Sequence, residues 1–280
     1  MDKPLIVSVN NELVKRARSL RQKKRRVETG LFLVEGIHHI GQALDAGWDV
    51  ESVFYAPDLL ASQYANEIIS RVSDRARAVS TEVINSLAGK DNPQGIVAIV
   101  VQKQTLVSNL GLIGSAVALV SPQDPGNVGT ILRAMDAVGA DALFLVDGGV
   151  ELYHPTVVRS SMGAIFWKPV AQTSFDEFRA WAQTGNYQLI GTSSHANAGY
   201  KTLIPQTLWA LVLGNEQKGL SAEQIKACDV TVSLPMRGRV SSLNLAVAAG
   251  ILLYELKKYG QATPRLPQFG QPESTWGKKR

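Results

Sequence analysis

Short apolar runs alternate with longer amphipathic stretches through most of the chain, and this alternation predicts an α/β protein. In the first hundred residues, runs rich in β-branched and aromatic residues predict strands at 31–36, 50–56 and 95–101. Helical spacing or helix-forming composition predicts helices at 11–26, 37–47, 58–71 and 83–89. These elements predict a compact α/β domain over residues 1–102.

From Ala116 onward, the pattern repeats strand, loop and helix. Apolar runs predict strands at 116–120, 142–146, 188–192, 209–213 and 230–234. Such a repeat favours a mainly parallel sheet with helices on both faces, and ligands of such sheets bind beyond the carboxyl ends of the strands. The polar, glycine-bearing stretch 103–115 is interpreted as a linker. The second domain then spans 116–262, and 263–280 forms a flexible tail.

The last predicted helix, within 234–256, is apolar on nearly every side. Such a helix is expected to be buried all round. Ser241 or Ser242 can cap its start with a side-chain oxygen. Polar Ser242 and Asn244 at the mouth of a buried helix are costly unless they are paired or functional.

The composition is that of an ordinary globular protein and excludes several classes. The 280 residues are 45% hydrophobic and 19% charged. We expect no membrane span and no signal peptide, because no apolar run reaches roughly 18 residues and the start lacks an apolar region. Cys228 is the single cysteine, and with four scattered histidines it offers no metal-ligand spacing. We therefore expect no metal and a reducing, cytoplasmic location.

The net charge of +5 allows a nucleic-acid partner, and one segment favours it. The predicted helix 11–26 carries a dense basic block on its polar face. Such a block is either a solvated face or a binding site for the RNA backbone, and its self-repulsion favours RNA. The candidate RNA-binding residues here are Arg18, Arg21, Lys23, Lys24, Arg25 and Arg26.

Three segments at predicted strand ends carry the candidate chemistry. We call 121–140 the first motif segment, 211–221 the second and 234–256 the third. They read D-P-G-N-V-G-T-I-L-R, L-G-N-E-Q-K-G-L and P-M-R-G-R-V-S-S-L-N at their centres. Together and in this order, they resemble the signature motifs of the SpoU (TrmH-like) family of RNA ribose 2'-O-methyltransferases, in the SPOUT superfamily. The N-terminal half resembles the L30e-like substrate-binding domain that often precedes it.

This resemblance implies S-adenosylmethionine as cofactor, RNA as substrate, a C-terminal trefoil knot and a homodimer through the C-terminal domain. Asn127 follows a Pro-Gly turn and can also cap the helix after it. The catalytic residues implied are Arg133, Asn127, Glu216, Ser242 and Asn244. The implied cofactor contacts, largely through the main chain, are Gly214, Leu234, Met236, Leu243, Thr192 and Leu213. Glu35 and Arg237 join the candidate RNA-binding residues, and an N-P-Q-G segment at 92–95 is expected near RNA.

Several functions are compatible with this pattern. The first expectation is methylation of ribosomal RNA, with 23S rRNA favoured and tRNA second. A non-catalytic RNA-binding or ribosome-assembly factor with the same fold is the rival, although it would not need all five catalytic positions. A nicotinamide-dependent oxidoreductase is disfavoured, because no G-x-G-x-x-G follows the first strand. Nor is the second motif segment a phosphate loop, because Leu220 stands where a lysine is required.

Overall fold

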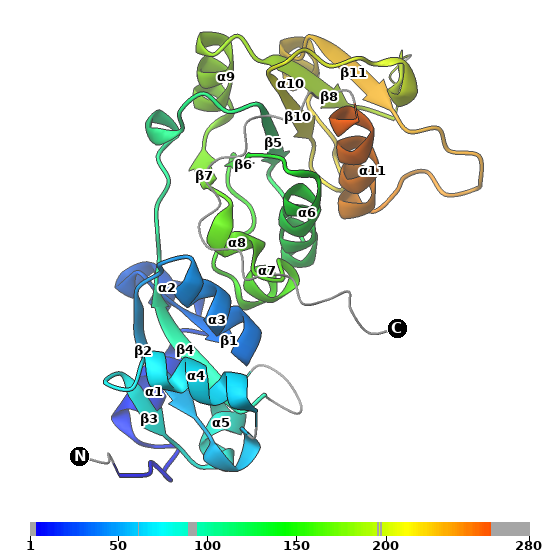
Figure 1. Ribbon diagram of the computed structural model, residues 1–280. Helices are drawn as coiled ribbons and strands as arrows, with labels where there is room; N and C mark the ends of the chain where they lie inside the picture. The colour runs from blue at the N-terminus through cyan, green and yellow to red at the C-terminus, as the bar shows by residue number, and fades with distance from the viewer. Residues whose placement is uncertain (1–3, 61, 89–93, 195, 197, 259–280) are drawn as a thin grey trace, which may run out of the picture. The chain divides into compact units, whose positions relative to one another are not determined.

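The computed structural model describes residues 4–60, 62–88, 94–194, 196 and 198–258 (Figure 1). Its contacts divide the chain into two compact units. Among the described residues, the first unit holds 4–18 and 33–101, and the second holds 19–32 and 102–258. The predicted linker 103–115 thus falls in the second unit, where Val107 is buried in the core and a strand begins at Ser115.

The first hundred residues form a 4-stranded sheet in the order β1-β4-β2-β3, in which β2 pairs antiparallel with β4 and parallel with β3. Its strands are β1 (Leu31–Glu35), β2 (Val50–Tyr55), β3 (Ala76–Ala78) and β4 (Ile96–Val101). The helices are α1 (Glu12–Ser19), α2 (Lys23–Thr29), α3 (Ile37–Asp45), η1 (Pro57–Leu59), α4 (Gln63–Arg71) and α5 (Thr81–Leu87). The α/β prediction is therefore confirmed for this half, although β3 was not predicted.

The predicted helix 11–26 is wrong as a single element, because the chain forms α1 and α2 with a break at residues 20–22. Leu20 is buried at this break. The carbonyl groups of Leu20 and Arg21 accept hydrogen bonds from the guanidinium of Arg26, at 2.8 and 2.7 Å. A side chain from the next helix thus satisfies the carbonyls that the break releases from helical bonding.

The second unit is built on a 7-stranded sheet in the order β7-β6-β5-β10-β8-β11-β9, in which neighbouring strands pair in parallel. The five predicted strands correspond to β5, β6, β8, β10 and β11, while β7 and the short β9 were missed. The strands are β5 (Ser115–Val120), β6 (Ala142–Val146), β7 (Val170–Thr173), β8 (Gln188–Thr192), β9 (Ala198–Gly199), β10 (Trp209–Leu213) and β11 (Val230–Ser233).

Helices cover both faces of this sheet, as predicted. Phe178 and Ala182 of α9 pack with one set of alternating strand residues, and the segment around η2 joins that core. The opposite set points to the other face, where Figure 1 shows α6 and α11 side by side. The helices are η2 (Val107–Asn109), α6 (Pro125–Val138), α7 (Pro155–Ser160), α8 (Ala164–Trp167), α9 (Phe175–Thr184), η3 (Tyr200–Thr202), α10 (Ala222–Ala227) and α11 (Leu245–Lys257).

The expectation that the last helix is buried all round is wrong. Ala249 and Leu253 of α11 are buried, but Val247, Ile251 and Tyr254 are 51%, 38% and 63% exposed. These three residues follow the i, i+4, i+7 spacing that places side chains on one helical face. Within the described residues, α11 packs on α6, β10 and η3, so one apolar face remains exposed.

Four further expectations depend on which residues the structure describes. The tail 263–280, and Asn92 and Pro93 of the N-P-Q-G segment, lie outside them. No helix in the described part of the chain is long and apolar enough to cross a membrane. In the same part, no group of three or more His, Cys, Asp or Glu side chains is arranged to hold a metal ion.

Candidate functional site

The three motif segments meet at the carboxyl edge of the 7-stranded sheet. The first follows β5, the second follows β10 and the third follows β11, and Figure 1 shows the long loop between β11 and α11. Because the sheet is parallel, the carboxyl ends of these strands lie on the same edge. Segments that lie about a hundred residues apart in the sequence are therefore neighbours in space.

A carboxylate of the second motif segment binds the first. Glu216 accepts hydrogen bonds from the backbone N–H of Gln123, at 3.0 and 3.2 Å to its two oxygens, and of Asp124, at 3.2 Å. It also accepts one from Nδ2 of Asn127, at 3.3 Å. Peptide N–H groups at the start of α6 thus surround the charge, and the helix dipole favours it there.

Two asparagines extend this contact to the third motif segment. Oδ1 of Asn127 accepts a hydrogen bond from Nδ2 of Asn244, at 2.9 Å. Oδ1 of Asn244 accepts from the backbone N–H groups of Ala246 and Val247, at 2.9 and 3.2 Å. A chain of hydrogen bonds therefore runs from Glu216 through Asn127 and Asn244 to the start of α11. We call Glu216, Asn127 and Asn244 the three-motif network.

The carboxylate fixes the orientation of both amides in the three-motif network. A carboxylate only accepts hydrogen bonds, so Asn127 must turn its NH₂ group toward Glu216. Its oxygen then faces Asn244, which must donate. The oxygen of Asn244 is left for the helix N–H groups, which only donate. Each donor thus faces an acceptor, so the network has a single consistent arrangement of its amide groups.

The hydrogen bonds also change the acidity of Glu216. Burial raises the pKa of this carboxyl group, but hydrogen bonds from its own backbone, from Asp124, Asn127 and Gln123 outweigh burial. The pKa is therefore below the ordinary value for glutamate. A carboxylate so fully engaged as an acceptor is a weak proton acceptor, and its geometry is that of a positioning group.

Two predicted helix caps are wrong. Asp124, not Asn127, caps α6 by accepting from the N–H of Gly126 at 2.7 Å, and Asn127 lies buried inside the first turn. Asn244, not Ser241 or Ser242, caps α11. Both displaced assignments have one cause. The cap position depends on where the helix begins, and the apolar pattern places that start only within a few residues.

Asn215 was missed by the sequence analysis although it shapes the second motif segment. Its Nδ2 donates to the carbonyl of Ser121 at 2.8 Å, which joins the second segment to the first. Its Oδ1 accepts from the backbone N–H groups of Gln217 and Lys218, at 2.9 and 3.1 Å. The available signal was an asparagine at a strand end, since such side chains bond the backbone two residues on.

Gly214 permits the close approach of backbone from its own loop, and its predicted contact with the cofactor stays a prediction. A Cβ added at Gly214 would lie 2.2 Å from the carbonyl carbon of Gly219 and 2.4 Å from the nitrogen of Leu220. The backbone of Asn215 and Gly219 exchanges hydrogen bonds at 3.2 and 2.8 Å, so this turn is closed on itself.

Gly214→Ala is expected to lower the free energy of unfolding by about 1–3 kcal/mol, because the added methyl group meets backbone that cannot rotate away. Urea unfolding followed by circular dichroism measures the change. Gly111→Ala is the control, since a Cβ at Gly111 meets nothing within 4 Å and the expected change is small. Equal stability of Gly214→Ala and the natural protein would contradict the close approach.

The remaining candidate cofactor residues lie on the same edge. Thr192 ends β8, and its hydroxyl donates to the carbonyl of Val212 at 3.2 Å. Leu213 is buried at the end of β10, and Leu234 and Met236 are partly buried after β11. Leu243 is exposed at the end of the same loop. Together they offer apolar side chains and peptide groups.

The side chains of Arg133 and Ser242 are exposed and lie outside the three-motif network. Arg133 lies on α6, six residues after Asn127, and its side chain is exposed. Ser242 is exposed in the loop before α11. The three-motif network includes neither of them. Both side chains are thus accessible to a ligand, and their catalytic roles stay predictions.

The candidate RNA-binding residues divide into exposed and buried groups. Arg18 and Glu35 are partly buried. The exposed residues are Arg21, Lys23, Lys24, Arg25 and Arg237. Arg26 contradicts the expectation, because it is 1% exposed and its guanidinium forms an ion pair with Glu151, at 2.6 and 2.7 Å. It is not presented to RNA, and a run of charges cannot reveal which member faces inward.

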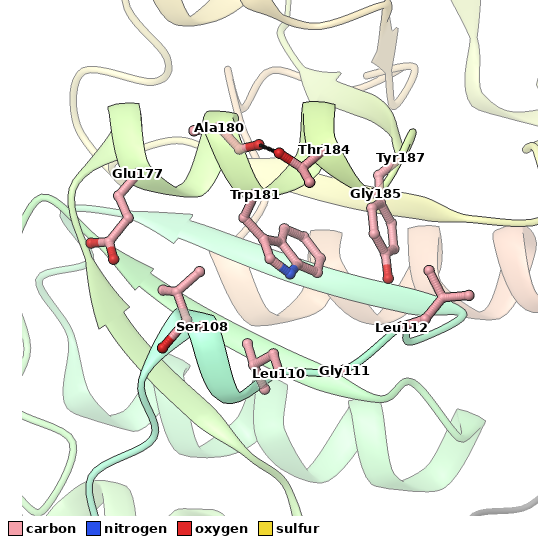
Figure 2. Close-up of a pocket in the computed structure, with 11 residues that line it drawn as sticks. Ser108, Leu110, Gly111, Leu112, Glu177, Ala180, Trp181, Thr184, Gly185 and Tyr187 are labelled. Atoms are coloured by element: carbon pink, nitrogen blue, oxygen red, sulfur yellow. Dashed lines mark hydrogen bonds between the residues drawn. The ribbon is translucent and has the colours of Figure 1, made fainter.

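A hollow of about 490 Å³ lies between α9 and the segment 107–112 (Figure 2). Trp181 and Tyr187 line it, and the hydroxyl of Tyr187 bonds both backbone groups of Ile113. None of the residues that line it belongs to the motif segments. It is therefore separate from the site at the carboxyl edge of the sheet.

Comparison with known families matches both halves of the chain. Residues 114–254 match the SpoU rRNA Methylase family, and residues 11–98 match the MRM3-like substrate binding domain. The 23S rRNA (guanosine(2553)-2'-O)-methyltransferase RlmP of Bacillus subtilis is 28% identical over 252 residues, which cover 90% of this chain and 98% of that protein. The 23S rRNA (uridine(2479)-2'-O)-methyltransferase of Streptomyces viridochromogenes is 31% identical over 245 residues, covering 84% and 85%.

Solved structures give the same picture. The AdoMet-bound rRNA methyltransferase from Sinorhizobium meliloti has a TM-score of 0.84 and 32% identity, covering 91% of this chain and 98% of that one. The SpoU methyltransferase AviRb from Streptomyces viridochromogenes, in complex with AdoMet, has a TM-score of 0.81 and 31% identity, covering 90% and 100%. The likeness thus extends over both domains.

Proposed function

The chain belongs to the SpoU rRNA methylase family, and we propose that it transfers the methyl group of S-adenosylmethionine to a ribose 2'-hydroxyl of 23S ribosomal RNA. The observation that carries this proposal is the three-motif network, in which Glu216, Asn127 and Asn244 hold the three loops together at one sheet edge. A factor that only bound RNA would not need this assembly, and two similar proteins of solved structure hold AdoMet.

The loops around this edge suit the cofactor. Leu234, Met236 and Leu243 supply apolar contacts for an adenosyl group, while peptide groups after β8 and β10 supply hydrogen bonds. S-adenosylmethionine supplies a methyl group that is already activated on a positively charged sulfur. The protein's contribution is to place the ribose hydroxyl in line with that methyl group and to exclude competing geometries.

Arg133 is the group proposed to act on the developing charge. The hydroxyl oxygen becomes negative as its proton leaves, and a guanidinium within reach stabilises that charge or holds the neighbouring phosphate. A guanidinium keeps its proton, so Arg133 does not serve as a general base. Glu216 is also disfavoured as the base, because backbone and side-chain donors already occupy its oxygens. Ser242, exposed in the loop before α11, would orient the substrate.

The choice of 23S rRNA rests on the relatives' specificity. The enzymes from Bacillus subtilis and Streptomyces viridochromogenes named above methylate 23S rRNA at a guanosine and a uridine. The second candidate is tRNA, which the same chemistry would serve. The exposed basic residues of α2 and Arg237 supply contacts to phosphates in either case. A ribosomal substrate also supports the cytoplasmic location that we propose.

The deciding experiment maps ribose methylation across cellular RNA with and without this protein. We expect one 2'-O-methyl mark in 23S rRNA to disappear when the protein is removed. Purified protein with radiolabelled S-adenosylmethionine should then methylate 23S rRNA and leave tRNA unlabelled. Labelling of tRNA alone would move the proposal to the second candidate. No transfer to any RNA, together with RNA binding, would favour a non-catalytic factor.

We also propose the trefoil knot and the homodimer that the family resemblance implies. The exposed apolar face of α11, formed by Val247, Ile251 and Tyr254, supports a second copy as its cover. Burying these side chains in a partner would remove them from water, and apolar burial drives most association.

Val247→Glu combined with Tyr254→Glu is expected to convert a dimer into monomers, because two charges would be buried without partners. Light scattering after gel filtration measures the mass. Arg179→Glu, at an exposed position of α9, is the control and should leave the mass unchanged. A monomeric natural protein would contradict the dimer.

A further inference from the structure

Arg26 is one of few charged residues buried in the described chain, and its guanidinium is almost fully engaged. Nε and Nη2 donate to the two oxygens of Glu151, at 2.7 and 2.6 Å, and Nη1 donates to the carbonyls of Leu20 and Arg21. The pair with Glu151 is bidentate, which fixes an angle as well as a distance. Both partners belong to the second compact unit.

Glu151 lies in a loop that is joined to the first motif segment. The loop follows β6, and its Val150 N–H donates to the carbonyl of Pro122 at 2.9 Å. Gly149 has φ +98°, and a Cβ there would lie 2.3 Å from the same carbonyl oxygen. Ser121 adds a hydrogen bond from its hydroxyl to the carbonyl of Asp147, at 3.1 Å.

Pro122 precedes the residues that bind Glu216. The N–H groups of Gln123 and Asp124 hold that carboxylate, so the backbone around Pro122 sets one side of the three-motif network. A continuous set of contacts therefore runs from Arg26 to the candidate methyl-transfer site. Each step is a hydrogen bond or a van der Waals contact with the backbone, which leaves little freedom for adjustment.

The Arg26 side of the same pair is connected to exposed cations. Arg21, Lys23, Lys24 and Arg25 surround Arg26 in the sequence, and all four are exposed. Exposed lysines and arginines supply phosphate contacts, which fix the register and orientation of a nucleic acid. Their position relative to the sheet edge depends on how α2 is held, and Arg26 is the charged anchor of α2.

We propose that Arg26 and Glu151 form a positioning pair that registers the RNA backbone, bound by residues 21–25, with the methyl-transfer site. The proposal rests on the RNA methyltransferase function stated above. It assigns to the pair a role in the rate of the chemical step rather than in RNA affinity, because the pair itself is shielded from RNA.

Stability alone does not explain the pair. Apolar residues of similar volume commonly match or exceed a buried ion pair in stability. What an apolar pair lacks is the directionality of a bidentate contact, which holds α2 at one angle to the loop that contains Glu151. A misplacement of about 1 Å in the reacting groups lowers rates by up to about 10²-fold. A contact that fixes the angle of α2 can therefore have a measurable effect on the rate of methyl transfer.

The test is the full chain with Glu151→Gln, assayed by single-turnover methylation of 23S rRNA at several RNA concentrations. We expect the rate at saturating RNA to fall by about tenfold. The RNA concentration at half-saturation and the affinity for S-adenosylmethionine should each change by less than about twofold, because the exposed cations and the cofactor loops are intact. Hydrogen exchange should rise at 121–124, while the strands of the sheet stay protected.

Arg25→Gln is the matched control, one residue away on the exposed face of α2, where Arg25 forms an ion pair with Glu28. This variant should show the opposite result. Half-saturation should need a higher RNA concentration, and the slope of log RNA affinity against log salt concentration should be smaller by about one. The rate at saturating RNA should stay within about twofold of the natural protein. If Glu151→Gln does not fold, Arg26→Lys replaces it, since lysine keeps the charge but lacks the planar fork. The same loss of saturating rate is then expected.

Three results separate the alternatives. A variant with lower stability but an unchanged saturating rate would overturn the positioning role and leave a structural one. A variant that loses RNA affinity instead of rate would equally overturn it. Failure of the natural protein to methylate any RNA would overturn the proposed function itself. The natural protein is therefore assayed before any variant is compared with it.

Discussion

Arg133→Ala is expected to lower the rate of methyl transfer by about 10²–10³-fold while leaving the affinity for S-adenosylmethionine within about twofold. The reason is that Arg133 lies exposed on α6, outside the three-motif network, so its loss does not disturb the loops that hold the cofactor. Its proposed partner is the oxygen that becomes negative only during the reaction. Interactions made only in the transition state change rate rather than binding.

Single-turnover methylation measures this rate, and calorimetry measures cofactor affinity. Arg133→Lys is an informative companion, because lysine keeps the charge without the fork and should recover only part of the rate. Arg179→Ala, an exposed arginine on α9, controls for loss of a surface charge. Full activity of Arg133→Ala would remove Arg133 from the mechanism, whereas loss of cofactor binding would assign it a structural role.

Glu216→Gln is expected to damage both the fold and the activity, although it alters a single atom. The new amide presents a donor where backbone and Asn127 donors already converge. If the amide oxygen takes the position of Oε1, the bonds from Asp124 and Asn127 persist, but the NH₂ group then faces the N–H of Gln123, which also donates. If the amide is reversed, its NH₂ group faces the N–H of Asp124 and Nδ2 of Asn127, which also donate. One group in the network is always left unsatisfied.

We expect a loss of about 1–3 kcal/mol in the free energy of unfolding and of about 10²-fold in methyl transfer. The stability loss should depend on pH. Because the folded state lowers the pKa of Glu216, its contribution is complete above the unfolded value of about 4.3 and is lost as the pH falls through the folded value. The difference between Glu216→Gln and the natural protein should therefore shrink in acid.

Asn244→Asp tests the other end of the same network. The carboxylate keeps the oxygen that caps α11 but has no proton for Oδ1 of Asn127. Asn244→Ala removes both, and loss of the cap alone costs about 1 kcal/mol. Methyl transfer should fall in both variants, with the larger stability loss in Asn244→Ala. Normal transfer by Asn244→Asp would show that the bond to Asn127 is dispensable.

The sequence could predict elements whose pattern is local. The runs of β5, β6 and β10 are buried throughout and read as strands from their composition alone. By contrast, β7 has only Val170 and Ala171 buried, and its pairing with β6 is decided by the sheet. The break between α1 and α2 also escaped prediction, because it depends on Arg26 satisfying carbonyls at 20 and 21.

The site shows the same division between local and distant information. Motif resemblance found Asn127, Glu216 and Asn244, but not that they bond to one another across 89 and 117 residues. Arg26 is indistinguishable from Arg25 in the sequence. Its burial follows from a glutamate 125 residues away, which no charge pattern reveals. Partners at such separations are decided by topology, which a linear pattern describes only coarsely.

The three-motif network has a consequence for the timing of biosynthesis. Asn244 precedes the last helix that the structure describes, and within the described residues it is Asn244 that donates to Oδ1 of Asn127. A nascent chain from which only the first two motif segments have emerged therefore still lacks the third segment of its candidate site. An enzyme proposed to modify ribosomal RNA would thus remain inert toward the ribosome translating it until the third motif segment has also emerged.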